Sequence, residues 1–510
     1  MTAHRIDRRA AMTLLVGGCS AILLPGRIAL AAHPAGFDDG LPRATPADQG
    51  MATDAMLAFL TEVVDRGFEF HSFMLARHGA VLAEGYWWPY RAELPHMTHS
   101  LTKSVTATAI GMALAEGRFA LTDKVVSFFE AELPPVVSEN LAAMTIEDLL
   151  TMRTGHAGET SGSVWRPIRT SWVAEFFKIP VVHRPGTTFV YTSAATYMLS
   201  ALISKTTGRN TYDYLKPRFF QPLGISGEEW AAGPQDITPG ANGLSWKVAD
   251  SLKLGILHQQ EGRHAGRQIV PADWVRAVHQ PHVPGRYGYQ WWLGPNRYQA
   301  IGLFGQYSYV FPDSGVVLAL MSAMTRPRRT EWEEVLDRHM PMMVAGSGSG
   351  SSALPRLRAL TDSLRVNAPL AAATSPTAAR ISGKTYAIAP NVDAVDAIRI
   401  DIADGKGRLT LRDDRNEHRV DFGLGGWIEG STSLTGHKLH HEYQPNSMRV
   451  VAGGGWSDPA TLEIILQFTE TAFQDRLRLR FDGDSLAYDR SVNVNSGDLA
   501  RPTLTGRLKA

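Results

Sequence analysis

The sequence predicts an α+β fold: an antiparallel sheet flanked by helices, with a helical cluster beside it, followed by a small all-β barrel domain. Strand-like segments lie near both ends of residues 33–345, with helix-like segments between them. A G-S-G-S-G-S-S stretch then has the composition of a flexible linker. Beyond it, short alternating segments replace the helical patterns. We therefore assign an export signal peptide to 1–32, the α+β domain to 33–345, the linker to 346–375 and the barrel to 376–510.

Residues 1–32 have the pattern of an export signal. Arg8 and Arg9 precede the apolar stretch A-A-M-T-L-L-V-G-G-C-S-A-I-L-L, and the sequence A-L-A at 29–31 fits a cleavage site. We expect an exported protein, periplasmic or secreted. The paired arginines resemble a twin-arginine signal, but a Sec signal stays open, and V-G-G-C is only a faint lipoprotein box. The only cysteine, Cys19, lies in this segment, so the mature chain would have no disulfide. No later segment is apolar enough to span a bilayer.

The elements of the α+β domain follow in order from local patterns. A hairpin is predicted around 72–88, turning at His78 and Gly79. Helices are predicted from Ser100 to a stop at Gly117, after an N-cap at Thr145, over Y-M-L-S-A-L-I-S-K-T-T-G, and over V-A-D-S-L-K-L-G-I-L-H-Q-Q-E-G. Strands are predicted for Y-G-Y-Q-W-W-L, G-Q-Y-S-Y-V-F-P and G-V-V-L-A-L-M-S, and T-E-W-E-E-V-L-D-R-H-M closes the unit as a helix.

The last part of the chain alternates with a period of two. The strand-like segments are I-R-I-D-I, R-L-T-L-R, M-R-V-V-A, L-E-I-I-L-Q-F and R-L-R-L-R-F, with Gly, Asp and Asn between them. We expect a closed barrel, because closure removes exposed strand edges.

Composition excludes several classes of function. A net charge of +1 argues against a dedicated nucleic-acid or membrane-surface binder. There is no H-E-x-x-H, no G-x-S-x-G, no phosphate loop and no dinucleotide fingerprint. We expect no metal site and no cofactor, and a small molecule as the binding partner. The oligomeric state stays open.

The segment T-H-S-L-T-K-S-V carries the candidate chemistry. Ser100 and Lys103 are three residues apart at the head of a predicted buried helix, so their side chains share one face. A serine hydroxyl becomes a useful nucleophile when a base removes its proton, and a neighbouring amine can be that base. The free N–H groups at a helix start can also hold a developing oxyanion.

A second segment, H-R-P-G-T-T-F-V-Y-T-S-A-A-T-Y, contains Tyr191 and Ser193. A Pro-Gly turn delivers an aromatic strand predicted to end at Tyr191. A phenol can shuttle a proton when a nearby cation, such as Lys103, favours its ionised form.

Taken together, Ser100-x-x-Lys103 and Tyr191-x-Ser193 resemble the penicillin-recognising serine hydrolases, of β-lactamase/transpeptidase-like fold. The nearest branch is the class C β-lactamase-like group, with its esterases, D-amino-acid peptidases and nylon-oligomer (6-aminohexanoate-dimer) hydrolases. The resemblance extends over about residues 40–345. Five further segments carry it: L-T-D-K-V, M-T-I-E-D-L-L-T-M-R-T-G, P-G-T-T-F-V-Y, Q-P-L-G-I and G-L-F-G-Q-Y-S-Y-V-F-P-D-S-G-V-V-L. The barrel is similar to the lipocalin-like module of some members.

The resemblance implies a role for each residue. Ser100 would form an acyl-enzyme, Lys103 would assist its deprotonation, and Tyr191 would act as general base and then as acid for the leaving group. The order in which lysine and tyrosine take the proton stays open. The oxyanion hole would use the N–H of Ser100 and one from Phe304-Gly305-Gln306.

Two departures bear on the substrate. The second motif usually ends in asparagine, whereas this chain has Ser193, with a shorter reach and one donor instead of two. The third motif usually carries Lys or His, whereas G-L-F-G-Q at 302–306 has no cation. In the family that lysine helps hold a penicillin carboxylate, so its absence favours a neutral ester or amide.

Three functions remain open on the sequence: a serine hydrolase acting on small esters or amides, a D,D-peptidase or β-lactamase, and a binding module that kept the fold without turnover. Tyr289, Trp291 and Trp292 are candidates for an acyl pocket, with core packing as the alternative. His99 adjoins the nucleophile, but no acid is evident to orient it, so we assign it no catalytic role.

Overall fold

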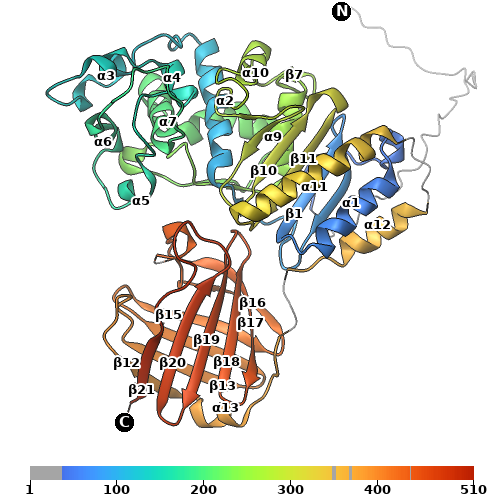
Figure 1. Ribbon diagram of the computed structural model, residues 1–510, viewed down its shortest axis with the longest axis vertical. Coiled ribbons are helices and arrows are strands. Elements are labelled where there is room, and N and C mark those ends of the chain that lie inside the picture. Colours follow the sequence, from blue (N-terminus) through green and yellow to red (C-terminus); the bar gives the residue numbers. More distant parts are fainter. Residues whose placement is uncertain (1–36, 347–351, 367–369, 437, 510) are drawn as a thin grey trace, which may run out of the picture.

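The computed structural model describes residues 37–346, 352–366, 370–436 and 438–509. The predicted signal peptide and residues 347–351 of the predicted linker lie outside them. The described chain folds into an α+β domain and a β-barrel (Figure 1), which confirms the predicted fold class. Among the described residues, none of the helices is both long and apolar enough to cross a membrane.

The α+β domain is built on one antiparallel sheet with the strand order β2-β1-β11-β10-β9-β8. The strands are β1 (Phe70–Arg77), β2 (Ala80–Tyr86), β8 (Trp292–Leu293), β9 (Tyr298–Ile301), β10 (Tyr307–Phe311) and β11 (Val316–Ser322). β1 pairs with β11, so the two ends of the domain meet in the middle of the sheet. His78 and Gly79 make the predicted turn with φ of 51° and 83°, the left-handed conformations that a tight hairpin requires.

Helices cover both faces of this sheet (Figure 1). One face carries α1 (Thr53–Asp65), α11 (Arg326–Ala345) and α12 (Ala353–Asp362), and the other carries α9 (Val248–Gln259). Trp332 of α11 packs edge-on against Phe70 of β1, with ring centroids 4.9 Å apart. α12 lies within the range 346–375 that the sequence predicts as a linker, and it packs on α1 and β2. Part of that range is therefore an ordered helix.

A helical cluster extends from the sheet and places the two candidate motifs. Its helices are α2 (Thr102–Ala115), α3 (Glu139–Ala143), α4 (Ile146–Leu150), α5 (Gly162–Trp165), α6 (Trp172–Lys178), α7 (Ser193–Thr207) and α8 (Thr211–Leu215). The remaining elements of the domain are α10 (Ala272–Val278) and the short strands β3 (His96–Met97), β4 (Glu229–Trp230), β5 (Leu244–Trp246), β6 (Arg263–His264) and β7 (Arg267–Gln268).

Local signals fix the ends of these helices as the sequence predicts. Thr145 and Asp148 form a capping box at α4. Gly208 ends α7 at φ 71°, and Gly117 follows α2 at φ 70°. α2 is buried on nearly all sides and packs against α7. A Cβ at Gly111 would lie only 2.1 Å from the Trp274 ring, so this small residue lets α10 approach.

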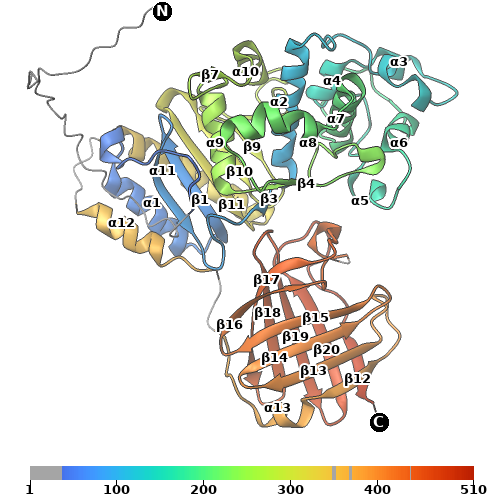
Figure 2. The same cartoon turned by 180° about the vertical axis from the view of Figure 1, so that it is seen from behind.

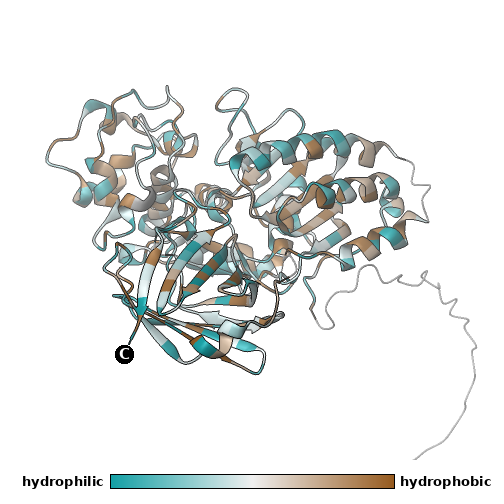
Figure 3. Cartoon of the chain, turned by 60° about the horizontal axis from the view of Figure 1, so that its bottom comes forward, coloured by the Kyte–Doolittle hydropathy of each residue, from teal (hydrophilic) through white to brown (hydrophobic). Residues whose placement is uncertain are grey.

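The C-terminal domain is a closed barrel, as predicted (Figure 2). After α13 (Pro376–Ile381) its strands are β12 (Lys384–Ile388), β13 (Ala397–Ala403), β14 (Lys406–Arg412), β15 (Glu417–Leu424), β16 (Trp427–Thr432), β17 (Met448–Asp458), β18 (Thr461–Phe468), β19 (Gln474–Asp482), β20 (Ser485–Val492) and β21 (Leu504–Leu508). β15 pairs with β17 and closes the barrel, while β16 continues as a hairpin from β17. Buried and exposed residues alternate along β19, and Figure 3 shows alternating apolar and polar residues along the barrel strands.

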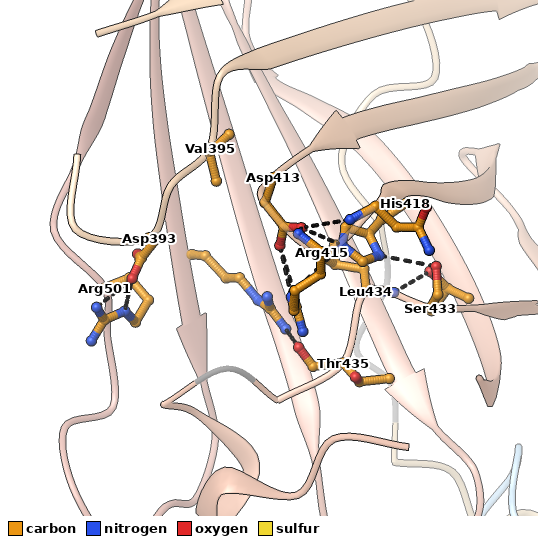
Figure 4. A network of polar contacts seen from close by, with 12 residues as sticks. Asp393, Val395, Asp413, Arg415, His418, Ser433, Leu434, Thr435 and Arg501 are labelled. Atoms are coloured by element: carbon orange, nitrogen blue, oxygen red, sulfur yellow. Dashed lines mark hydrogen bonds and ion pairs between the residues drawn. The ribbon is translucent and has the colours of Figure 1, made fainter. Parts of the chain in front are cut away.

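Charged side chains from the loops at one end of the barrel are paired with one another (Figure 4). Asp393 binds Arg501 at 2.5 Å, and Asp413 binds Arg415 at 2.6 Å and His418 at 3.0 Å. Burial alone would raise the pKa of Asp413, but hydrogen bonds from Arg415 and His418 hold that pKa at about 2. The network therefore neutralises charge that the barrel has partly removed from water.

Two buried histidines lie where the α+β domain contacts the barrel. His96 Nδ1 lies 2.8 Å from the Met97 carbonyl, which can only accept, so His96 carries its proton on Nδ1. His96 Nε2 then accepts from His71 Nδ1 at 2.9 Å. The Met97 N–H donates to the Glu470 carbonyl of the barrel. His96 thus has one protonated and one unprotonated nitrogen and is neutral, and hydrogen bonds through Met97 join this histidine pair to the barrel.

These histidines predict a loss of stability in acid. Burial lowers the pKa of His96 to about 3 and that of His71 well below its usual value, whereas both are near 6.5 in the unfolded chain. Between these limits the unfolded state binds more protons, so stability falls as pH drops from about 6.5 towards 3, by up to about 1.4 kcal/mol per pH unit for each histidine. Urea unfolding between pH 7.5 and 5 measures this slope.

Other buried histidines add to the slope, so a variant isolates the contribution of His96. His96→Gln is expected to be less stable at pH 7.5 and to show a shallower dependence on pH. An unchanged slope would show that His96 does not titrate on unfolding.

Candidate active site

Ser100 lies in a 3₁₀ turn, His99–Leu101, directly before α2. The regular helix therefore begins two residues later than the motif predicts, and Ser100 stands at its entrance. Gly302, at the end of β9, presses against this turn: a Cβ there would lie 2.3 Å from the Thr98 carbonyl oxygen. Within the described residues, the Ser100 N–H donates to no acceptor. The turn thus presents a hydroxyl and a free backbone donor together.

Lys103, in the first turn of α2, is 1% exposed and lies between three oxygen atoms. Its Nζ is 3.1 Å from Ser100 Oγ, 3.2 Å from Ser193 Oγ and 3.1 Å from the Ala241 carbonyl oxygen. An ammonium group has three donors, and these three oxygens can accept all of them. No carboxylate forms an ion pair with Lys103 in the described part of the chain.

Ser193 is the first residue of α7, and a carboxylate fixes its backbone. Both oxygens of Glu159 accept from the Ser193 N–H, at 3.1 and 2.9 Å, and Glu159 also accepts from the Ser161 hydroxyl at 2.7 Å. A negative charge at the N-terminus of a helix is favourable, because the free N–H groups there carry partial positive charge. Glu159 thereby positions Ser193 against Lys103.

Tyr191 joins the group through its ring. Lys103 Nζ lies 5.0 Å from the centroid of the Tyr191 ring. The Trp292 ring stacks on Tyr191, with ring centroids 5.4 Å apart. The aromatic strand predicted to end at Tyr191 is absent: residues 188–192 form no helix and pair with no strand among those described. Instead Phe189 and Tyr191 pack on Tyr287 and Trp292.

The predicted strand over 287–293 is likewise reduced to β8, Trp292–Leu293. Of the three aromatic candidates there, only Trp292 lies beside Tyr191. Trp291 is fully buried, and the Tyr289 hydroxyl donates to Glu147 at 2.6 Å, so both belong to the core.

The predicted third segment lies between β9 and β10. Gln306 is fully buried, and its amide donates to the Ser322 carbonyl at 2.9 Å. The Gly305 N–H donates to the Gly302 carbonyl at 3.2 Å, inside a turn that needs φ 95°. Phe304 packs edge-on against His99 at 5.1 Å. Of the three residues, Phe304 therefore borders the nucleophile turn, while Gly305 and Gln306 shape the loop behind it.

The segment that contains this site matches a known protein family. Residues 58–339, more than half of the chain, match the family described as Beta-lactamase. The chain belongs to the beta-lactamase family. The family segment contains every predicted site residue and ends within α11, so the barrel lies outside it.

Relatives of this beta-lactamase family member include both sequences and solved structures. The 6-aminohexanoate-dimer hydrolase of Paenarthrobacter ureafaciens is 23% identical over 57% of this chain and 82% of its own length. The structure of a putative 6-aminohexanoate-dimer hydrolase from Bacillus anthracis covers 61% of this chain and 89% of its own, with 18% identity and a TM-score of 0.51. A penicillin-binding protein homologue from Pyrococcus abyssi aligns with 89% of this chain, with 14% identity and a TM-score of 0.46.

Sequence reasoning missed two groups that contact the site. The Ala241 carbonyl is a backbone atom, so no residue type marks it. Glu159 lies in an irregular loop more than thirty residues before Ser193. Its position depends on how the loop folds over the start of α7, and no local pattern signals that.

Proposed function

We propose that this protein is an exported serine hydrolase that cleaves a small ester or amide through an acyl-enzyme on Ser100. The observation that carries the proposal is the 3.1 Å contact between Ser100 Oγ and Lys103 Nζ at the entrance of a buried helix. The relatives named as 6-aminohexanoate-dimer hydrolases support an amide among the substrates.

The proposed reaction has two halves. Ser100 Oγ attacks the substrate carbonyl while its proton passes to the Lys103–Tyr191 pair, and the same pair returns that proton to the leaving alcohol or amine. Water then attacks the acyl-enzyme, giving up a proton to the pair, and the carboxylic acid leaves as Ser100 regains its hydrogen. The Ser100 N–H supplies one donor for the oxyanion. Phe304 and Gln306 of the predicted segment, and the adjoining Leu303, have backbone N–H groups without a partner in the described chain, and they are candidates for the second.

A covalent label tests this proposal. Reaction with a fluorophosphonate, followed by mass spectrometry of peptides, is expected to place the adduct on Ser100. Absence of any adduct would favour the binding module without turnover. Nitrocefin turnover at a rate comparable to a nitrophenyl ester would favour the β-lactamase or D,D-peptidase alternative. Cell fractionation and the N-terminal sequence of the mature protein test export.

Glu159 provides a test of the second motif. Glu159→Ala is expected to lower kcat/KM for a nitrophenyl ester by up to about tenfold, because Ser193 and through it Lys103 lose their fixed position. It is also expected to lower stability by about 1 kcal/mol, since α7 loses its N-terminal carboxylate. Glu159→Gln keeps an acceptor for the Ser193 N–H and should lose less activity. Full activity in Glu159→Ala would rule out the positioning role.

A further inference from the structure

The barrel contributes side chains next to the proposed nucleophile. The His441 ring lies 6.1 Å from the His99 ring and 6.4 Å from Phe304, measured between centroids. His99 directly precedes Ser100 in the nucleophile turn. A turn of the barrel, residues 438–442, thus borders the site from outside the family segment.

This barrel turn is firmly anchored. The fully buried His440 binds Asp475 at 2.5 Å and stacks on Phe473 at 4.5 Å. The His441 N–H donates to Asn495 Oδ1 at 2.8 Å, and its ring binds Ser496 Oγ at 2.5 Å. His440, His441 and Glu442 all have φ between 52° and 57°, an unfavourable conformation for residues other than glycine. Strain of this kind persists where the surroundings enforce it, and it clusters at functional sites.

Arg166 of the α+β domain lies against this turn, just after α5. It donates to the His441 carbonyl, and its guanidinium is 3.8 Å from the Glu442 carboxylate, too far for a hydrogen bond. A guanidinium has five N–H donors, and the described residues provide no other acceptor for this one. Burial lowers the pKa of Arg166 although Glu442 opposes the effect, so the positive charge is incompletely compensated.

The positive charge of Arg166 contributes to the electrostatics of the nucleophile turn. Burial is the main cause that lowers the pKa of His99, followed by the neighbouring His441 and His96, and the charges of Arg166 and Lys103 add smaller contributions. The same two cations lower the pKa of His441 to about 4, again after burial. Arg166 and Lys103 therefore both place positive charge near the nucleophile turn, and an anionic group of a substrate beside Arg166 would be stabilised.

We propose that Arg166, held by the barrel turn 438–442, binds a carboxylate on the substrate, so that the preferred substrates are small esters or amides that carry a carboxylate group. This inference rests on the proposed function, because it assigns a substrate class to the same site. It differs from the neutral substrate expected from the sequence. That expectation rested on the missing cation at 302–306, whereas Arg166 supplies a cation from another part of the fold.

Two matched esters test the inference: mono-p-nitrophenyl glutarate and its methyl ester, in which the carboxylate is masked. The full-length protein is expected to prefer the carboxylate ester by about tenfold or more in kcat/KM. Arg166→Gln should remove that preference, lowering kcat/KM for the carboxylate ester about 10- to 100-fold through KM, because a charge-assisted pair is lost. The same variant should change the masked ester less than about threefold. Glu442→Gln should strengthen the preference, since it removes the competing carboxylate.

Arg169→Gln is the matched control, because it removes the same charge three residues away, from a side chain whose guanidinium donates to the Arg166 carbonyl. It should change neither ester by more than about threefold. If Arg166→Gln has a lowered melting temperature, Arg166→Lys decides: retention of the preference supports the inference, and its loss contradicts it.

Three outcomes overturn the inference alone while Ser100 still forms its adduct: equal loss on both esters, no loss on either, or the same selective loss in Arg169→Gln. If neither ester is hydrolysed and no adduct forms on Ser100, the proposed function fails, and the inference fails with it.

Discussion

Ser100→Ala is expected to abolish hydrolysis of nitrophenyl esters, lowering kcat/KM at least about 10⁴-fold, and to eliminate labelling by a fluorophosphonate. The variant removes one oxygen atom from a half-buried turn, so the fold should be retained. Circular dichroism and the melting temperature check the fold, and stopped-flow ester hydrolysis measures the rate. Turnover at the wild-type rate would show that Ser100 is not the nucleophile.

A second serine makes this prediction sharper. Ser193 Oγ also contacts Lys103, at 3.2 Å, so distance from the amine does not separate the two hydroxyls. The backbone N–H groups separate the two serines. The Ser193 N–H donates to the Glu159 carboxylate, whereas the Ser100 N–H has no acceptor among the described residues. A developing oxyanion would be stabilised at Ser100 and repelled by Glu159 at Ser193.

Ser193→Ala is therefore the matched control for Ser100→Ala. It should retain labelling on Ser100 and lose about tenfold in rate, because Lys103 keeps two of its three oxygen contacts. An adduct found on Ser193 in the wild-type protein would reverse the assignment of the two residues.

The sequence predicted the contacts in this candidate site that depend on short spacing along the chain. Ser100 in the 3₁₀ turn and Lys103 in α2 are about one helical turn apart, which brings their side chains together. The two-residue step from Tyr191 to Ser193 likewise places both beside the start of α7. The alternation of buried residues predicted the barrel, and β15–β17 pairing closes it as expected.

The remaining parts depend on contacts between distant segments, which no local pattern carries. The aromatic residues at 187–191 alternate as a strand would, but they pack on Tyr287 and Trp292 instead of pairing with a sheet. Glu159 and Arg166 come from irregular chain around α5, and His441 comes from a barrel turn with left-handed residues. Glu159 reaches the site once the α+β domain has folded, whereas the contacts of His441 with His99 and Arg166 form only when the two domains meet.

Lys103→Met and Tyr191→Phe are each expected to lower kcat/KM at least about a hundredfold, the lower range for acid–base groups. Lys103→Met keeps the length of the side chain but removes every donor from the space between Ser100, Ser193 and Ala241. It should also lower stability by about 1–3 kcal/mol, because buried acceptors lose their partner. Tyr191→Phe keeps the ring that stacks on Trp292 and faces Lys103, so a loss of rate there reports on the hydroxyl alone.

The double variant Lys103→Met/Tyr191→Phe distinguishes one shared proton pathway from two separate roles. If amine and phenol handle the same proton, removing the second group adds little once the first is gone, and the double variant should be about as slow as the slower single variant. If they act independently, the losses multiply to about 10⁴-fold or more. Lys103 Nζ lies 5.0 Å from the centroid of the Tyr191 ring, so the two groups are direct neighbours and we expect the shared pathway. Multiplying losses, measured as single-turnover acylation of Ser100, would show that the two residues act independently and would contradict the shared pathway.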